Sequence, residues 1–110
     1  MGSQSEKRIV WLASTLEDTR NLPVVARQRL GYELHRLQNG REPHSWKSMA
    51  TVGKGVREIR VNDDSRAFRT MYVTNVGESI YVLHVFEKKT GKTAAKDLNI
   101  ARKGLKEIKR

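Results

Sequence analysis

The sequence predicts a single α+β domain, residues 1–110, in which helices pack on one face of a small antiparallel sheet. Three observations predict it. Apolar residues recur at helical spacing in residues 23–38, three strand-like runs joined by short turns follow in residues 56–86, and a second helical stripe occupies residues 93–109. A chain of this length holds one core, and its 37% hydrophobic content argues against disorder.

The first half is expected to contain a short strand and a helical hairpin. Residues 7–12 are largely apolar, and Ser14 and Glu17 have the spacing of a capping box that opens a short helix. Pro23 ends that helix and suits the first turn of the next, which Gly40 ends. The apolar face of this second helix is Ala26, Leu30, Leu34 and Leu37. Residues 41–55 have no clear period and are expected to form a loop.

The second half is expected to form a three-stranded meander and a C-terminal helix. Short links between residues 56–61, 67–74 and 80–86 imply antiparallel pairing. The third run is apolar on both faces, which indicates a central strand. Thr93 is a suitable cap for the last helix, whose apolar stripe is Ala94, Leu98, Ala101, Leu105 and Ile108.

The composition limits the location and the chemistry. The chain has no cysteine, no apolar run of membrane-spanning length and a polar start unlike a signal peptide, so we expect a cytoplasmic protein without disulfides, with residues 1–6 as a flexible tail. Its three histidines lack a paired metal-ligand spacing, and there is no glycine-rich phosphate loop or nucleophile elbow. No metal or other cofactor is therefore expected.

Positive charge is concentrated in the second part of the chain. The 22 lysines and arginines outnumber the 12 acidic residues, and residues 41–110 hold 16 of these basic groups against 8 acidic ones. Such a field attracts polyanions, of which nucleic acid is the natural candidate. The alternative is a basic protein with no nucleic-acid role.

A cluster of cations is expected on the sheet. Like charges on neighbouring strands repel, so such a cluster persists more easily when an anion occupies it, and arginine binds phosphate in a bidentate manner. The candidate groups are Arg57, Arg60, Arg69, Lys88, Lys89 and Lys92. The alternative is a solvated face in which the arginines pair with Glu58, Asp63 and Asp64.

Four aromatic residues lie among these charges. Tyr72 and Phe86 are candidates to stack an unpaired base, although each could equally belong to the core. Phe68 and Tyr81 are expected in the core because their strands are so apolar. His84 also lies in an apolar strand and is expected to be a satisfied core residue rather than a base.

Three segments carry a resemblance to a known family: VREIRV at residues 56–61, AFRTMYV at 67–73 and YVLHVFEKKT at 81–90. Together they resemble the phage-derived, HigB-like toxins of the RelE/ParE superfamily, over Val10 to about Arg102. The resemblance implies a RelE-like fold and a type II toxin–antitoxin system. It further implies a metal-independent, ribosome-dependent mRNA endonuclease (an mRNA interferase) that inhibits translation, silenced by an antitoxin of the helix-turn-helix type.

The same resemblance suggests roles for four basic residues. In this family RNA is cleaved by attack of a ribose 2′-hydroxyl on its own phosphate, which needs a base, cations for the phosphate and a proton source for the leaving oxygen. Arg69 matches the recurrent phosphate-clamping arginine, and Arg60 matches a second phosphate-binding position. Lys88 or Lys89 stands where the family places a basic residue that protonates the leaving group.

The general base is left open among three residues. Glu58 stands where RelE itself has lysine, Glu42 matches a Glu-Pro pair of the YoeB-like branch, and His84 is the third candidate. Two other functions also remain open: a ParE-like toxin that acts on DNA gyrase without cleaving RNA, and a non-catalytic basic module that binds nucleic acid.

Overall fold

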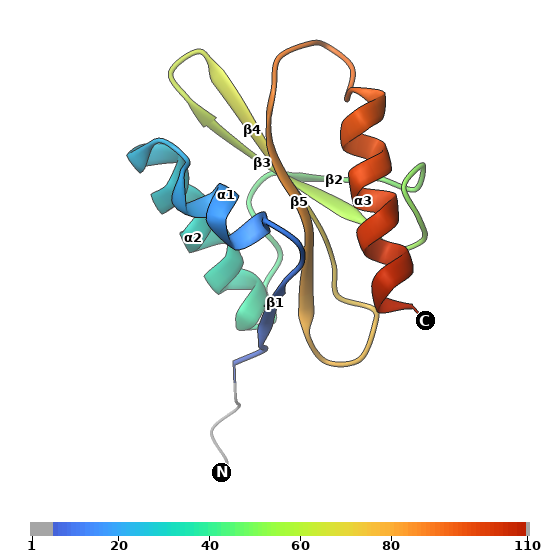
Figure 1. The fold of residues 1–110 in the computed structure, drawn as a ribbon. Helices are drawn as coiled ribbons and strands as arrows, with labels where there is room; N and C mark the ends of the chain where they lie inside the picture. The colour runs from blue at the N-terminus through green and yellow to red at the C-terminus, as the bar shows by residue number, and fades with distance from the viewer. Residues whose placement is uncertain (1–5, 110) are drawn as a thin grey trace.

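A five-stranded mixed sheet and three helices build the protein, whose computed structural model describes residues 6–109 (Figure 1). The strands are β1 (Ile9–Trp11), β2 (Trp46–Ser48), β3 (Arg57–Asp63), β4 (Arg66–Val73) and β5 (Ile80–Lys88). The helices are α1 (Thr15–Arg20), α2 (Val24–Gln38) and α3 (Ala95–Ile108). The predicted α+β class is confirmed.

The sheet order is β1-β5-β4-β3-β2. Strands β3, β4 and β5 form the predicted antiparallel meander, and β5 lies between β1 and β4, as its two apolar faces predict. The expectation of a wholly antiparallel sheet is wrong, because β1 pairs parallel to β5. Parallel pairing needs a long connection, and the hairpin and meander between these strands supply one.

Strand β2 falls in the segment that was expected to be a loop. It pairs antiparallel with β3 through the partners Trp46–Ile59, Lys47–Glu58 and Ser48–Arg57. A strand of three residues is too short to show a period in the sequence. Its position is stabilised by Trp46, whose ring lies 4.0 Å from the guanidinium carbon of Arg57.

Helices cover both faces of the sheet, which corrects the expectation that they share one face (Figure 1). The stripe of α2 packs on what we call the hairpin face, where Ile59 and Tyr72 are buried. Helix α3 packs on the opposite face, the α3 face, over Met71 and Leu83. Met71 and Tyr72 are neighbours in β4 that point to opposite faces, and both are 0% exposed, so each face needs a cover.

A β-bulge in β5 interrupts this alternation. Met71 pairs with His84 but Tyr72 pairs with Val82, so Leu83 is an extra residue. Leu83 packs in the α3-face core, and His84 next to it also contacts α3. The bulge therefore turns two consecutive side chains to the same face and shifts the alternation for the rest of the strand.

The helix ends differ in detail from those predicted. The Ser14 hydroxyl donates to the Asp18 carboxylate at 2.8 Å instead of forming a capping box with Glu17. Helix α3 begins at Ala95, after Ala94 and not after Thr93, and no side chain caps it. Helix α2 ends as predicted, with Gly40 at a φ of 78°. Within residues 6–109, no helix has the length and hydropathy needed to cross a membrane.

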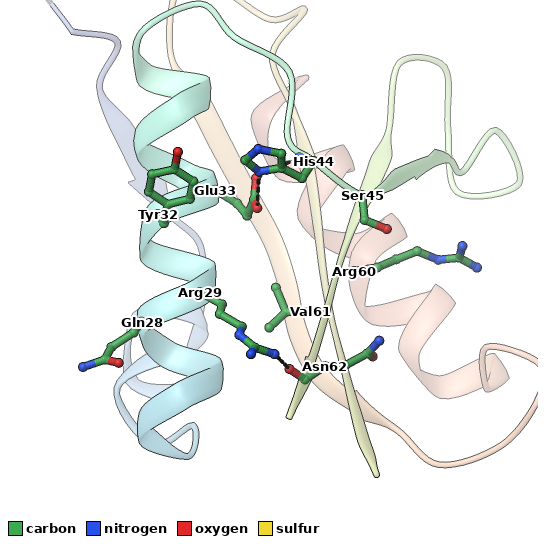
Figure 2. A pocket seen from close by; sticks show the side chains of 9 residues that line it. All are labelled: Gln28, Arg29, Tyr32, Glu33, His44, Ser45, Arg60, Val61 and Asn62. Carbon is green, nitrogen blue, oxygen red and sulfur yellow. Dashed lines mark hydrogen bonds and ion pairs between the residues drawn. The ribbon is translucent and has the colours of Figure 1, made fainter. Parts of the chain in front are cut away.

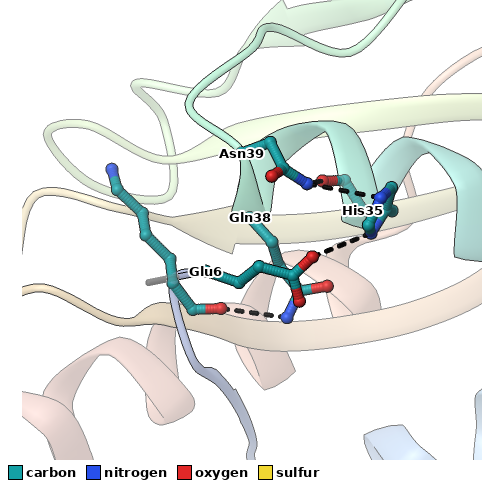
Figure 3. A network of polar contacts seen from close by, with 5 residues as sticks. Glu6, His35, Gln38 and Asn39 are labelled. Carbon is teal, nitrogen blue, oxygen red and sulfur yellow. Dashed lines mark hydrogen bonds and ion pairs between the residues drawn. The ribbon is translucent and has the colours of Figure 1, made fainter. Parts of the chain in front are cut away.

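Contacts with the end of α2 position the chain before β1. The expected flexible tail, residues 1–6, lies outside the described residues except for Glu6. The Glu6 carboxylate lies 3.6 Å from Nδ1 of His35, and Gln38 donates to the carbonyl of Lys7 at 2.9 Å (Figure 3). The chain is thus in contact with α2 from Glu6 onward.

Two glycines permit a matched test of the backbone. Gly31 lies in α2 with open space around an added Cβ, so Gly31→Ala is expected to raise the free energy of unfolding by about 0.5–1 kcal/mol. Gly55 has a φ of 84°, and its Cβ would fall 2.2 Å from Asn75. Gly55→Ala is expected to lower the free energy of unfolding by about 1–2 kcal/mol. Urea unfolding measures both, and equal effects would contradict the described backbone.

Tyr72 provides a pH test of the hairpin-face core. Burial raises the pKa of Tyr72, and the nearby Arg57 guanidinium only partly offsets this. Because the pKa of Tyr72 is higher in the folded protein than its value of about 10 in the unfolded chain, the neutral phenol stabilises the folded state below about pH 10. That stabilisation is lost as the pH rises through the pKa of the folded protein. Tyr72→Phe is therefore expected to move alkaline unfolding, followed by circular dichroism, to higher pH. Tyr32, which is 55% exposed, provides the control, and Tyr32→Phe is expected to unfold at the same pH as the wild type. If Tyr72→Phe also unfolds at the wild-type pH, this account of Tyr72 is wrong.

Candidate functional site

The α3 face carries a row of three side chains beyond the apolar core. Arg60 of β3 and Arg69 of β4 are directly paired, and Arg69 pairs with Phe86 of β5 on its other side. Directly paired residues of antiparallel strands have Cα atoms roughly 4.5–5.5 Å apart. The structure therefore brings together the two arginines expected to bind phosphate and one of the aromatics expected to stack a base.

The next row on this face contains Lys88. It pairs with Ala67, two residues before Arg69 in β4, so Lys88 and Arg69 are diagonal neighbours about 7–8 Å apart. We call Arg60, Arg69, Phe86 and Lys88 the cationic row. The bulge in β5 places Phe86 and Lys88 in it, because strict alternation would turn both to the hairpin face.

The expected lysines gather in a hollow at one end of this row. Lys88, Lys89 and Lys92 line a hollow of ≈ 410 Å³ between the end of β5 and the start of α3, and Lys96 of α3 lines it as well. Arg60 and Arg69 do not line this hollow. The expectation of one hollow common to all the cations is therefore corrected: Arg60, Arg69 and Lys88 share a face, and the lysines have a separate recess.

Arg69 is held by a buried carboxylate. Its side chain is 11% exposed, and its Nε lies 3.6 Å from Oε1 of Glu58, whose side chain is 1% exposed. Burial lowers the pKa of Arg69 and the charge of Arg60 lowers it further, while Glu58 acts in the opposite direction. Arg69 also donates to the carbonyl of Phe68 at 2.9 Å. Glu58 thus favours the charged form of Arg69 through its own charge, and neither of its oxygens forms a hydrogen bond to another described residue.

A buried histidine–aspartate pair flanks the row. Nε2 of His84 lies 2.7 Å from Oδ1 of Asp97, and the two residues are 8% and 7% exposed. The His84 ring stacks on Phe86 with 4.7 Å between ring centroids. The predicted burial of His84 is confirmed. Asp97 was missed, although its position on the apolar stripe of α3, three residues after Ala94, indicates a buried partner.

Three expected site residues lie elsewhere. Arg57 and Tyr72 are on the hairpin face, and Tyr72 is 0% exposed, so it offers no ring to a base. Arg57 is three residues from Arg60, an odd number that places it on the opposite face of β3. Its guanidinium donates to Glu42 at 2.6 Å, which keeps Glu42 on that side of the molecule.

A second hollow, of ≈ 480 Å³, lies between α2 and the edge of β3 (Figure 2). Arg29 donates to the carbonyl of Asn62, and His44 contacts the Glu33 carboxylate at 2.9 Å. Arg60 lines this hollow, but its guanidinium points away from α2 (Figure 2). Within residues 6–109, no group of three or more histidine or acidic side chains is placed to share a metal ion.

Comparison with known proteins gives one relationship. Residues 17–106 match the family model of the phage derived protein Gp49-like (DUF891) family. The searches of curated proteins and of solved structures returned no significant match. The matched segment runs from α1 through α3 and includes the whole cationic row and the His84–Asp97 pair. Because the match spans most of the chain, this protein belongs to the family of Gp49-like phage-derived proteins.

Proposed function

We propose that this protein is the toxin of a type II toxin–antitoxin system, and that it inhibits translation by cutting messenger RNA on the ribosome without a metal ion. Membership of a phage-derived family is consistent with a toxin-like role. The observation that carries the nuclease proposal is the direct pairing of Arg60, which is exposed, with Arg69, whose side chain is 11% exposed.

The two arginines form a site that an anion would stabilise. Directly opposed like charges destabilise a sheet, and burial together with Arg60 already lowers the pKa of Arg69. Among residues 6–109, Arg69 has Glu58 as an ion-pair partner, and no carboxylate forms an ion pair with Arg60. A phosphate bridging the two guanidinium groups would supply the missing charge in bidentate geometry.

Such a site suits cleavage by an internal 2′-hydroxyl. As the ribose oxygen attacks, negative charge grows on the phosphate oxygens, where two fixed guanidinium groups stabilise it more than in the ground state. Phe86, which is partly buried and stacks on His84, lies beside Arg69 and is the aromatic residue that we assign to the adjoining base, and Lys88 or Lys89 protonates the leaving 5′-oxygen.

Of the three candidate bases, we favour His84. Glu42 is bound to Arg57 on the other side of the sheet, and Glu58 is 1% exposed behind Arg69. His84 lines a solvent-open hollow next to Phe86, so a ribose beside the stacked base would be within its reach. Glu58 is then the residue that holds Arg69 in position.

The nuclease proposal predicts that Arg60→Ala removes most of the activity. Arg60 is exposed, so Arg60→Ala leaves no buried charge without a partner. Arg69→Ala, in contrast, would remove the ion-pair partner of the buried Glu58 carboxylate. Loss of one transition-state donor is expected to slow cleavage by about 10²–10³-fold. Message ends are mapped in a translating extract, with Arg27→Ala in α2, an exposed arginine on another element, as the matched control.

The outcomes separate the proposed function from its rivals. Cleavage by Arg60→Ala at the wild-type rate would contradict the nuclease assignment. Intact messages together with inhibition of gyrase supercoiling by the wild-type protein would indicate a ParE-like toxin. RNA binding without any cleavage would indicate a non-catalytic module.

The proposal also predicts a cognate partner. A toxin with an open cationic face needs a protein that silences it, which we propose to be a small antitoxin of the helix-turn-helix type. Capture of the tagged protein from its own host is expected to recover such a partner, with binding weakened by salt because the face is cationic. Recovery of no small acidic or helix-turn-helix protein would count against the toxin assignment.

A further inference from the structure

A charged side chain on the apolar stripe of α3 requires an explanation. Asp97 is 7% exposed, and its contact with His84 at 2.7 Å joins the first turn of α3 to the bulged segment of β5. A buried carboxylate is costly unless it is paired, and an apolar residue at this position would pack without that cost. Retaining the pair for stability alone is therefore a poor explanation.

The position of the pair indicates a chemical use. His84 and Asp97 both line a hollow of ≈ 450 Å³ along the part of β5 that β1 does not cover, and Phe86 lines it as well. Phe86 and Asp97 also line the adjoining lysine hollow. The pair thus sits where these two recesses meet, beside the cationic row.

We propose that Asp97 is a positioning residue for RNA cleavage, which holds His84 in the tautomer that acts as the general base. This inference rests on the proposed nuclease function. An ionised carboxylate only accepts hydrogen bonds, so His84 donates from Nε2 to Asp97 and leaves Nδ1 free. The same division of roles operates in serine hydrolases, where an aspartate orients the catalytic imidazole.

The proton transfers balance in this scheme. Nδ1 of His84 takes the proton of the ribose 2′-hydroxyl as the oxygen attacks phosphorus. The bond from phosphorus to the 5′-oxygen breaks, and that oxygen takes a proton from Lys88 or Lys89. The products are a 2′,3′-cyclic phosphate and a 5′-hydroxyl. Asp97 stabilises the imidazolium that forms and does not itself exchange a proton with RNA.

Other charged groups also surround His84. In the hollow that it lines they are Asp18 of α1, Arg66 of β4, Glu87 of β5 and Lys96 of α3. Arg66 and Glu87 form an ion pair at 2.9 Å and largely compensate each other. The Asp18 carboxylate accepts a hydrogen bond from the Ser14 hydroxyl. Asp18 is therefore an acidic residue of the same hollow that is paired with a residue other than His84.

The test is the pH dependence of cleavage by Asp97→Asn, measured in single turnovers of a defined message on isolated ribosomes. Loss of the carboxylate removes the group that orients the imidazole and stabilises the imidazolium formed in the reaction. The acid limb of the rate profile is therefore expected to move to lower pH, and the maximal rate to fall at least ~10-fold. Asp18→Asn, which removes an equal charge from the same hollow, should keep the wild-type profile.

The outcomes distinguish this inference from the function on which it rests. If Arg60→Ala cuts RNA as the wild type does, the nuclease function itself fails. If Arg60→Ala is inactive while Asp97→Asn keeps the wild-type rate and acid limb, only the role of Asp97 fails. A purely structural role would lower the melting temperature of Asp97→Asn and leave the acid limb unmoved, which also overturns the inference.

A measurement on the unaltered protein covers the case in which Asp97→Asn does not fold. With only three histidines in the chain, heteronuclear NMR can assign the ring nitrogens of His84. The neutral ring is expected to carry its proton on Nε2. A proton on Nδ1 with Nε2 bare would overturn the proposal.

Discussion

The bulge in β5 decides which side chains share the α3 face. One extra residue, Leu83, shifts the alternation of the strand, so that His84, Phe86 and Lys88 join Arg69 on the same side of the sheet. Without it, these three side chains would lie under the helical hairpin, and the arginines would face an unrelated set of neighbours. The bulge is compatible with a stable core because both sides of the sheet are covered, so the displaced Leu83 packs against α3.

Two buried carboxylates, one from Glu58 and one from Asp97, lie next to the cationic row on the α3 face. Glu58 lies behind Arg69, and Asp97 lies behind His84. Each carboxylate is shielded from solvent and faces a side chain to which the proposed function assigns a role, Arg69 or His84. Contacts of this kind restrict the positions of both side chains.

The elements that could be predicted from the sequence are those with a strong local signal. The stripe of α2 repeats over four turns, and the meander combines branched residues with tight turns, so both were identified. The pairing of Arg60 with Arg69 also follows, because adjacent strands joined by a short turn have a fixed register. Arg57 was misplaced although its spacing of three residues from Arg60 within one strand already puts the two side chains on opposite faces.

Other features depend on contacts between distant segments, which no local pattern records. Strand β2 exists because β3 offers an edge to it, and α3 covers the far face because Met71 and Leu83 need burial there. Asp97 looks like an ordinary acid in the first turn of a helix until His84 is placed against it.

The edge of β3 beyond β2 has a consequence for how the chain behaves in a crowded cell. An uncovered strand edge is a template for a strand of another molecule; β2 pairs with residues 57–59, and the backbone N–H of Arg60 donates to the carbonyl of Ser45. The carbonyl of Asn62 would be free for such an addition, but Arg29 of α2 already donates to it. Helix α2 therefore both covers the core and occupies one acceptor that a strand added at this edge would need.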